Sequence, residues 1–262
     1  MPRVCLASTV ALLLALSSPL GAQETAPAPA NTKSGASAKA KAPRRRTPGV
    51  YMGRRIAPVM SFEGGGAEWL MRPEREQEEQ PDAMIDALKI PKGATVADVG
   101  AGVGYTSLRL AKRVGETGTV LATDVQPKML LALAENVKAA GARNIKPIRA
   151  TATATGLPDD KVDLILMVDV YHELGDPETS LRLFRKALKT GGRLVLVEFR
   201  GEDPEVPIRP EHKMTVAQVR RELEPNGFTF KESLEFLPWQ HILIFEKPAE
   251  EKPVEEKKGE TK

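Results

Sequence analysis

Hydrophobic residues between positions 73 and 247 follow two different spacings, and each spacing predicts a type of element. Short apolar runs bounded by glycine or polar residues predict buried strands at 96–99, 119–122, 145–150, 162–167, 194–199, 228–234 and 241–246. Apolar positions three or four residues apart predict helices at 73–88, 108–114, 128–140, 178–188 and 215–223. Five glycines are expected to end helices, namely Gly115, Gly141, the pair Gly191 and Gly192, and Gly227.

The predicted elements alternate between strand and helix. This alternation is typical of an α/β fold, in which helices cover both faces of a mostly parallel sheet. The last two strands follow each other closely and are expected to pair antiparallel. With 262 residues and 41% apolar content, the chain is long enough for one sizeable core.

The stretch 96–124 carries the first chemical signal. A strand ends at Val99, and Gly100, Gly102 and Gly104 follow it in a loop that leads into a helix. Glycines there allow a tight turn and a close backbone approach to a ligand. Asp124 ends the next strand, where a carboxylate can accept hydrogen bonds from two ribose hydroxyls. The unit therefore predicts an adenosine-type cofactor.

The spacing of the glycines argues against a dinucleotide. That fingerprint needs glycine or alanine at the sixth position of the loop, and this chain has Tyr105. Asp98 stands two residues before the first glycine, where its charge would repel a pyrophosphate but would suit an ammonium group. S-adenosylmethionine carries an ammonium, a sulfonium and a ribose without a phosphate, so it is the favoured cofactor.

Asp98, the three glycines and Asp124 form a D-x-G-x-G-x-G motif followed by an acidic residue that ends the next strand. This pattern resembles the first two motifs of the class I S-adenosylmethionine-dependent methyltransferases. The resemblance covers residues 85–247 and implies a Rossmann-like, seven-stranded, mostly parallel sheet with helices on both faces and an antiparallel last strand. The cofactor-binding residues that it implies are Asp98, Gly100, Ala101, Gly102, Gly104, Tyr105, Asp124, Val125, Gln126 and Thr153. Thr153 lies in the loop where many relatives carry an acidic residue for the adenine.

Candidate catalytic residues follow the fourth strand of the predicted fold: Asp169, Tyr171, His172 and Glu173. Ligands of open α/β sheets bind at the carboxyl ends of the strands, so these side chains are expected to face the methyl group. His172 is the candidate general base for a hydroxyl acceptor. The alternative role for His172 is structural, as a cap of the following helix or a partner of the backbone.

A metal site is the less favoured reading of the three histidines. His172, His212 and His241 stand beside polar residues, and Glu198, Glu202 and Asp203 follow or end the fifth strand. Their spacing matches no short metal motif, so no metal is predicted.

The segment before the first strand of the motif is unusual. Trp69 and Leu70 could form a lid over the substrate, with Arg72, Arg75 and Glu79 near the polar end of the cofactor. The plainer alternative is a solvated helix face with Glu–Arg pairs four residues apart, and it is favoured for most of these charges.

Both ends of the chain are expected to lie outside the folded domain, which is placed at 56–247. Residues 1–22 resemble a secretory signal, which predicts export to the periplasm, with a membrane-anchored or cytoplasmic protein as the alternative. Cys5 is the only cysteine and lies in that segment. Residues 23–55 form a basic, Ala/Pro/Lys-rich linker and residues 248–262 a charged tail, both predicted to be disordered. Weak contact with an anionic surface is possible through the basic residues from Lys33 to Arg55.

The sequence therefore predicts an S-adenosylmethionine-dependent methyltransferase that acts on a small-molecule acceptor. Two alternatives belong to other classes: a non-catalytic module that binds or senses adenosine ligands, and an NAD-dependent oxidoreductase. A nucleic-acid partner is disfavoured because no aromatic residue stands among the basic residues from Lys33 to Arg46 and no base-reading motif follows the fourth strand. The net charge of +3 is too small to steer a partner, and the oligomeric state is left open.

Overall fold

The computed structural model describes residues 49–249. The predicted signal segment, most of the basic linker and most of the charged tail lie outside the described residues. Among residues 49–249, no helix combines the length and the apolar character that a membrane span requires.

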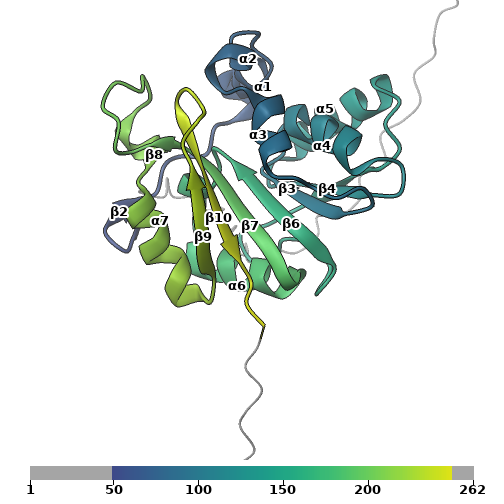
Figure 1. Cartoon of the computed structure of the whole chain (residues 1–262). Helices are drawn as coiled ribbons and strands as arrows, with labels where there is room; N and C mark the ends of the chain where they lie inside the picture. The colour runs from purple at the N-terminus through teal and green to yellow at the C-terminus, as the bar shows by residue number, and fades with distance from the viewer. Residues whose placement is uncertain (1–48, 250–262) are drawn as a thin grey trace, which may run out of the picture. The chain divides into compact units, whose positions relative to one another are not determined.

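One twisted sheet forms the centre of the domain, and its path runs β5-β4-β3-β6-β7-β10-β9 (Figure 1). Neighbouring strands are parallel except at β10, which runs antiparallel to both β7 and β9. The short strand β8 adds to the end of β7. The predicted α/β fold class is therefore confirmed, including the closing antiparallel pair. The strand bounds are β3 Thr95–Val99, β4 Thr119–Asp124, β5 Ile145–Arg149, β6 Val162–Val168, β7 Leu188–Arg200, β8 Lys213–Met214, β9 Thr229–Leu234 and β10 Gln240–Glu246.

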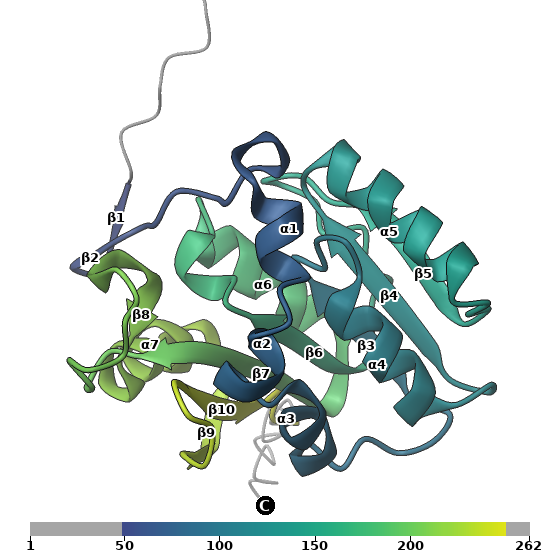
Figure 2. The same cartoon turned by 90° about the horizontal axis from the view of Figure 1, so that it is seen from above.

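Helices cover both faces of the sheet (Figure 2). One core cluster joins the sheet to α3, α4 and α5, through side chains such as Leu110 and Leu133. The other joins the opposite face to α6 and α7, through Phe184 and Val219. The helix bounds are α1 Gly66–Leu70, α2 Arg75–Glu78, α3 Pro81–Ala87, α4 Tyr105–Val114, α5 Pro127–Ala139, α6 Pro177–Ala187 and α7 Val216–Leu223. This layering leaves the carboxyl ends of the parallel strands at one edge, where loops gather.

The single helix predicted at 73–88 is two helices in the structure, α2 and α3. Gln80 separates them with φ 47°, in the left-handed region. Pro81 accounts for the break, because proline disfavours the helical conformation of the residue before it and then begins the next helix. The break lets α2 pack over the strand ends while α3 packs against the sheet face.

The glycines predicted to end the helix at 178–188 lie inside a strand. Helix α6 ends at Ala187, and β7 begins at Leu188 without a connecting loop. Gly191 has φ 73°, and the register between β6 and β7 shifts at this point. The two glycines therefore allow a bulge in β7 rather than a helix stop.

Residues 49–55, predicted as part of the disordered linker, form a hairpin of β1 Val50–Tyr51 and β2 Arg54–Arg55. Arg54 holds the hairpin to the domain, since its Nε and Nη2 donate to the Glu222 carboxylate of α7 at 2.8 and 2.9 Å. Glu222 is fully buried and also accepts a hydrogen bond from the Tyr171 hydroxyl at 2.7 Å. The ordered domain thus begins before the predicted boundary at residue 56.

Arg54→Ala is expected to lower the free energy of unfolding by about 3 kcal/mol, because it leaves the Glu222 carboxylate buried without its cation. Chemical denaturation at neutral pH measures the change. The neighbouring Arg55 is exposed, so Arg55→Ala is the matched control and is expected to change stability by less than about 0.5 kcal/mol. Equal effects of the two substitutions would contradict the role given to Arg54.

Candidate functional site

The loop between β3 and α4 requires its glycines. Gly100, Gly102 and Gly104 have φ values of 72°, 53° and 90°, a region that residues with side chains rarely adopt. Space is a second constraint, because a Cβ on Gly100 would lie 2.5 Å from Val170 and a Cβ on Gly102 would lie 2.5 Å from Leu70. The loop is thus fixed in shape, with α1 directly above it.

Asp124 ends β4 beside this loop. Its carboxylate accepts hydrogen bonds from the backbone N–H of Gly102 at 2.9 Å and of Gln126 at 2.7 Å. The side chain is buried, and burial raises the pKa of Asp124 above its usual value. The carboxylate therefore joins the glycine loop to the start of α5, which is the position predicted for a ribose contact.

Two further carboxylates lie at the ends of adjacent strands. Asp98 in β3 is 2% exposed and accepts a hydrogen bond from the Ser107 hydroxyl at 2.5 Å, and burial raises its pKa to about 6. Asp169, directly after β6, has φ 55° and accepts two bonds from the Gln240 amide at 2.8 and 2.9 Å. Burial, reinforced by the charge of Glu79, raises the pKa of Asp169 well above its usual value. Within residues 49–249, the side-chain hydrogen bonds of both carboxylates come from neutral donors, and this environment favours a cationic ligand.

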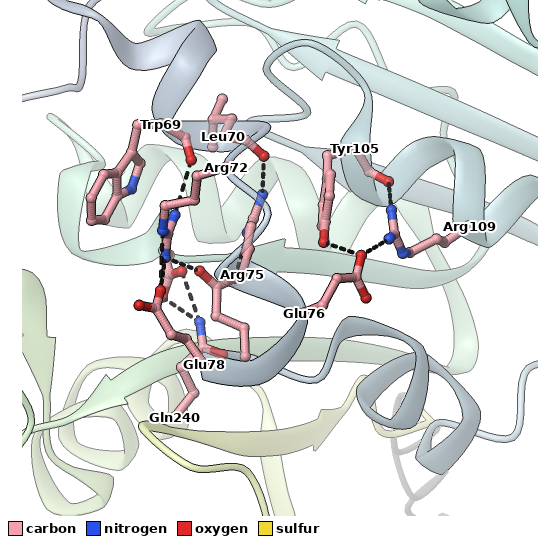
Figure 3. A network of polar contacts seen from close by, with 11 residues as sticks. Trp69, Leu70, Arg72, Arg75, Glu76, Glu78, Tyr105, Arg109 and Gln240 are labelled. Atoms are coloured by element: carbon pink, nitrogen blue, oxygen red, sulfur yellow. Dashed lines mark hydrogen bonds and ion pairs between the residues drawn. The ribbon is translucent and has the colours of Figure 1, made fainter.

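Helices α1 and α2 form a lid over these strand ends, and Figure 3 shows its polar network. Arg75 and Glu79 are each 4% exposed and form an ion pair at 2.5 Å, while Arg75 also donates to the Leu70 carbonyl at 3.1 Å. Arg72 binds Glu78 and Glu79 and stacks on Trp69 with 3.7 Å from its guanidinium carbon to the ring centre. The Arg75–Glu79 pair has the four-residue spacing of the favoured alternative, but its burial does not fit a solvated helix face, and Trp69 is 43% exposed.

Tyr105 anchors the lid to α4. Its hydroxyl donates to Glu76 at 2.7 Å, and the guanidinium groups of Arg75 and Arg109 lie 4.4 and 3.9 Å from its ring centre (Figure 3). Burial and the hydrogen bond to Glu76 raise the pKa of Tyr105 to about 12. The large residue at the sixth loop position thus packs against the lid and places Arg75 near Asp98.

Residues 56–65 form a strap across the same edge. The strap bonds to the backbone of His172 through Ala57 N–H at 3.0 Å, to the Glu173 carboxylate through Met60 N–H at 3.3 Å, and to the Gln126 amide oxygen through Phe62 N–H at 3.0 Å. Gln126, predicted to flank the adenine, is therefore engaged by the strap. The other predicted adenine neighbours, Val125 and Thr153, are both exposed, and Thr153 lies in the turn that pairs residues 151 and 154.

His172 is 1% exposed, and both of its ring nitrogens have partners. Nδ1 bonds to Glu198 Oε2 at 2.5 Å, and Nε2 lies 3.0 Å from Nδ1 of His212. Burial acts to lower the pKa of His172, but the Glu198 carboxylate outweighs it and holds the pKa above its usual value. An acceptor hydroxyl would reach His172 only through His212 or by displacing it, so the base role of His172 stays a prediction.

The other predicted catalytic residues lie in two different places. Tyr171 is fully buried in the core cluster beneath α6 and α7, where its hydroxyl binds Glu222 and burial raises its pKa. Tyr171 was predicted to face the methyl group of the cofactor, and in the structure its side chain points into the core instead. Glu173 lies at the strand ends under the strap, and burial raises its pKa to about 7. Asp169 and Glu173 therefore share the edge with Asp124, and Tyr171 does not.

Comparison with known proteins agrees with this geometry. Residues 96–192 match a family described as a methyltransferase domain. Over 116 residues, the chain is 34% identical to the ubiquinone/menaquinone biosynthesis C-methyltransferase UbiE of Citrobacter koseri, a match that covers 44% of this chain and 46% of that relative. The chain spans about half the length of the curated relatives it matches. A crystal structure of an S-adenosylmethionine-dependent methyltransferase from Aquifex aeolicus has a TM-score of 0.67 and 27% identity, and covers 71% of this chain and 100% of that one.

These matches confirm the predicted resemblance to the class I S-adenosylmethionine-dependent methyltransferases. The fold is also found in the [4+2]-cyclase SpnF, whose structure has a TM-score of 0.56 and 17% identity and covers 64% of this chain and 81% of that one. That likeness concerns the fold alone.

The site suits the cofactor of this methyltransferase family. S-adenosylmethionine offers two ribose hydroxyls, an ammonium and a sulfonium, and the strand ends offer Asp124 for hydroxyls and the buried Asp98 and Asp169 for positive charge. The charge of Arg75 acts on both Asp98 and Asp169, while its guanidinium is paired with Glu79 in the lid. These residues would hold the amino-acid end and the ribose of the cofactor.

Several residues of the methyltransferase site were not predicted in their observed roles. Gln240 holds Asp169 from the start of β10, 71 positions along the chain. Glu198 and His212 contact His172 from 26 and 40 positions away. A signal for Glu198 did exist in the sequence, since a glutamate that closes an apolar strand needs a buried partner.

Proposed function

We propose that the protein transfers the methyl group of S-adenosylmethionine to a small-molecule acceptor bound at the carboxyl edge of the sheet. The pair of buried carboxylates, Asp98 and Asp169, carries the proposal because each is hydrogen-bonded by a neutral donor and suits a cationic cofactor. When bound, S-adenosylmethionine supplies a methyl group on a positively charged sulfur atom.

The chain would contribute positioning and exclusion of water. Asp124 would orient the ribose, and the glycine loop would admit the cofactor backbone closely. The strap lies across the strand ends through its bonds to Gln126 and Glu173, which favours a small acceptor over a macromolecular one. Methyl transfer is an in-line displacement, so holding the two reactants aligned lowers the barrier. Asp169 and Glu173 lie where an acceptor would be oriented.

The names of the relatives suggest which acceptor atoms to test first. The UbiE proteins are named as C-methyltransferases, and the match with them covers 44% of this chain. Carbon acceptors of the quinol type therefore belong in the substrate panel beside hydroxyl and amine acceptors.

Titration calorimetry tests the cofactor. We expect S-adenosylmethionine and S-adenosylhomocysteine to bind with one site per chain, and we expect no heat from NAD at the same concentrations. Binding of NAD in preference to both sulfur compounds would support an oxidoreductase and contradict the proposal.

Turnover tests the transfer step. Formation of S-adenosylhomocysteine is measured with the carbon, hydroxyl and amine panels, and an increase that depends on one acceptor class is expected. Cofactor binding without turnover on any class would favour the non-catalytic module or another reaction on this fold, as the name of SpnF illustrates for that protein.

We also propose that residues 1–22 direct export, because a basic residue, an apolar stretch and a small-residue exit follow one another there. N-terminal sequencing of the native protein is expected to begin at Gln23. An intact Met1 on the native protein would contradict cleavage.

A further inference from the structure

Two imidazoles and a carboxylate from two segments meet at the edge of the sheet: His172 and Glu173 lie in the 3-10 helix η2 Tyr171–Glu173, and His212 lies about 40 positions further along. Nε2 of His172 and Nδ1 of His212 lie 3.0 Å apart, and one carboxylate oxygen of Glu173 lies with them in a group whose atoms are all within 4.8 Å of one another. We propose that His172, His212 and Glu173 bind a divalent transition-metal ion, with Zn²⁺ as the ion that fits best.

The orientation of His172 supports this assignment. Its Nδ1 is bonded to Glu198, which leaves Nε2 as the nitrogen that faces His212. A carboxylate on the far nitrogen is the usual support for a metal-binding histidine, because it fixes the ring and makes the ligand nitrogen more basic. Glu198 is itself fixed, since it is fully buried and its second oxygen accepts the Tyr171 N–H at 2.9 Å.

The spacing of the ligand atoms also fits one ion. Two nitrogens bound to a tetrahedral Zn²⁺ are separated by about 3.4 Å, close to the 3.0 Å observed between His172 and His212. The two rings are nearly perpendicular, at 81°. A shift of about 0.4 Å would open the pair to the metal-bound spacing.

The ligand types select the metal class. Two imidazoles and one carboxylate suit Zn²⁺ and related transition metals, whereas Mg²⁺ and Ca²⁺ prefer sites made of oxygen ligands alone. Three protein ligands leave a position for water or for an oxygen atom of a substrate. His172 and Glu173 lie at the same edge of the sheet as the cofactor-binding residues. The free coordination position of the ion would therefore face the proposed acceptor site.

His212 gives the ion a route from the surface. It ends the short 3-10 helix η3 Pro210–His212 and is only half-buried, in contrast to His172. An ion from solvent would therefore meet the half-buried His212 before the fully buried His172.

His241 provides a matched control. It lies opposite Glu198 in the β7–β10 pair and is fully buried, but it stands outside the group of three ligands. Among the described residues, neither of its ring nitrogens has a hydrogen-bond partner. Glu211, next to His212, is the corresponding control for a carboxylate.

The experiment measures metal binding by the full chain, without reference to turnover, so its failure is separate from any failure of the methyltransferase proposal. Protein stripped with a chelator is titrated with Zn²⁺ against a chromophoric competitor, and with Co²⁺ while its visible absorption is recorded. We expect one ion per chain, a Co²⁺ spectrum typical of nitrogen and oxygen ligands, and no competition from Mg²⁺.

His212→Ala and Glu173→Gln are expected to weaken Zn²⁺ binding by more than about 100-fold, and Glu198→Gln by about 10- to 100-fold through the orientation of His172. His241→Gln and Glu211→Gln are expected to leave it unchanged. Circular dichroism checks that each variant folds. His212→Ala is expected to disturb the fold least, because His212 is only half-buried. The proposal would be overturned if the wild-type protein bound no stoichiometric ion. It would also be overturned if His241→Gln lowered the Zn²⁺ affinity as much as His212→Ala.

Discussion

Asp124→Ala is expected to weaken the binding of S-adenosylmethionine by at least about 100-fold, which corresponds to roughly 2.7 kcal/mol. The carboxylate ends β4 and already fixes the glycine loop through Gly102 N–H. Its loss would remove the acceptor for the ribose hydroxyls and would loosen the loop that admits the cofactor. Titration calorimetry measures the affinity, and circular dichroism is expected to show an intact fold because the substitution lies at a strand end.

Two variants sharpen this prediction. Asp124→Asn keeps one carbonyl oxygen as an acceptor and is expected to lose less affinity than the alanine variant. Asp163 is the matched control, since it accepts hydrogen bonds from Thr95 N–H and Lys189 at the opposite end of the strands. Asp163→Ala is expected to change stability without changing cofactor affinity. An unchanged affinity in Asp124→Ala would mean that the ribose binds elsewhere.

Local sequence patterns predicted most of the elements because each element here has a local cause. Thr215 caps α7 by accepting the Gln218 N–H at 3.1 Å, and Gly227 closes the turn after it with φ 81°. Helix α4 ends where Gly115 adopts φ 71°. Capping and positive φ depend on a few neighbouring residues, so they are visible in the sequence.

The errors arose where tertiary contacts decide the structure. The hairpin at 49–55 is polar and basic, and its composition resembles a linker, but a buried glutamate 168 positions later binds Arg54. Gly191 and Gly192 were placed after a helix, and the pairing of β7 with β6 instead makes them part of a strand. Neither partner can be found from residues within one element.

The cofactor site was predictable and the neighbouring histidine cluster was not, for the same reason. Asp98, the glycine loop and Asp124 occupy 27 consecutive positions of one strand-helix-strand unit, so their spacing in sequence fixes their spacing in the fold. His172 follows β6, Glu198 lies in β7, and His212 comes shortly before β8. Their meeting depends on the strand order, which no spacing rule within the sequence reveals.

Asp98→Asn is expected to stabilise the protein at neutral pH while lowering its affinity for the cofactor. The buried carboxyl has a pKa of about 6 against an ordinary value of 3.8, so the folded state holds a proton that the unfolded chain releases. Its contribution to stability is complete below pH 3.8 and falls as the pH rises through about 6. The neutral amide of the variant avoids this loss. In chemical denaturation we expect the free energy of unfolding of the variant to exceed that of the wild type by about 2 kcal/mol at pH 7.5, and the two to be equal at pH 3.5.

The same carboxyl sets the pH dependence of cofactor binding. If the ammonium binds the ionised form of Asp98, affinity is expected to rise about tenfold between pH 5 and pH 7, because a proton must leave a group whose pKa is about 6. Calorimetry in buffers of different ionisation enthalpy would show the release of that proton at pH 5.5. In Asp98→Asn we expect affinity to fall by about 10- to 100-fold at pH 7, from the loss of a charge-assisted hydrogen bond, and this part of the pH dependence to vanish. A variant that kept both the affinity and the pH profile of the wild type would show that the ammonium is held by another group, and Asp169 would be the next carboxylate to replace.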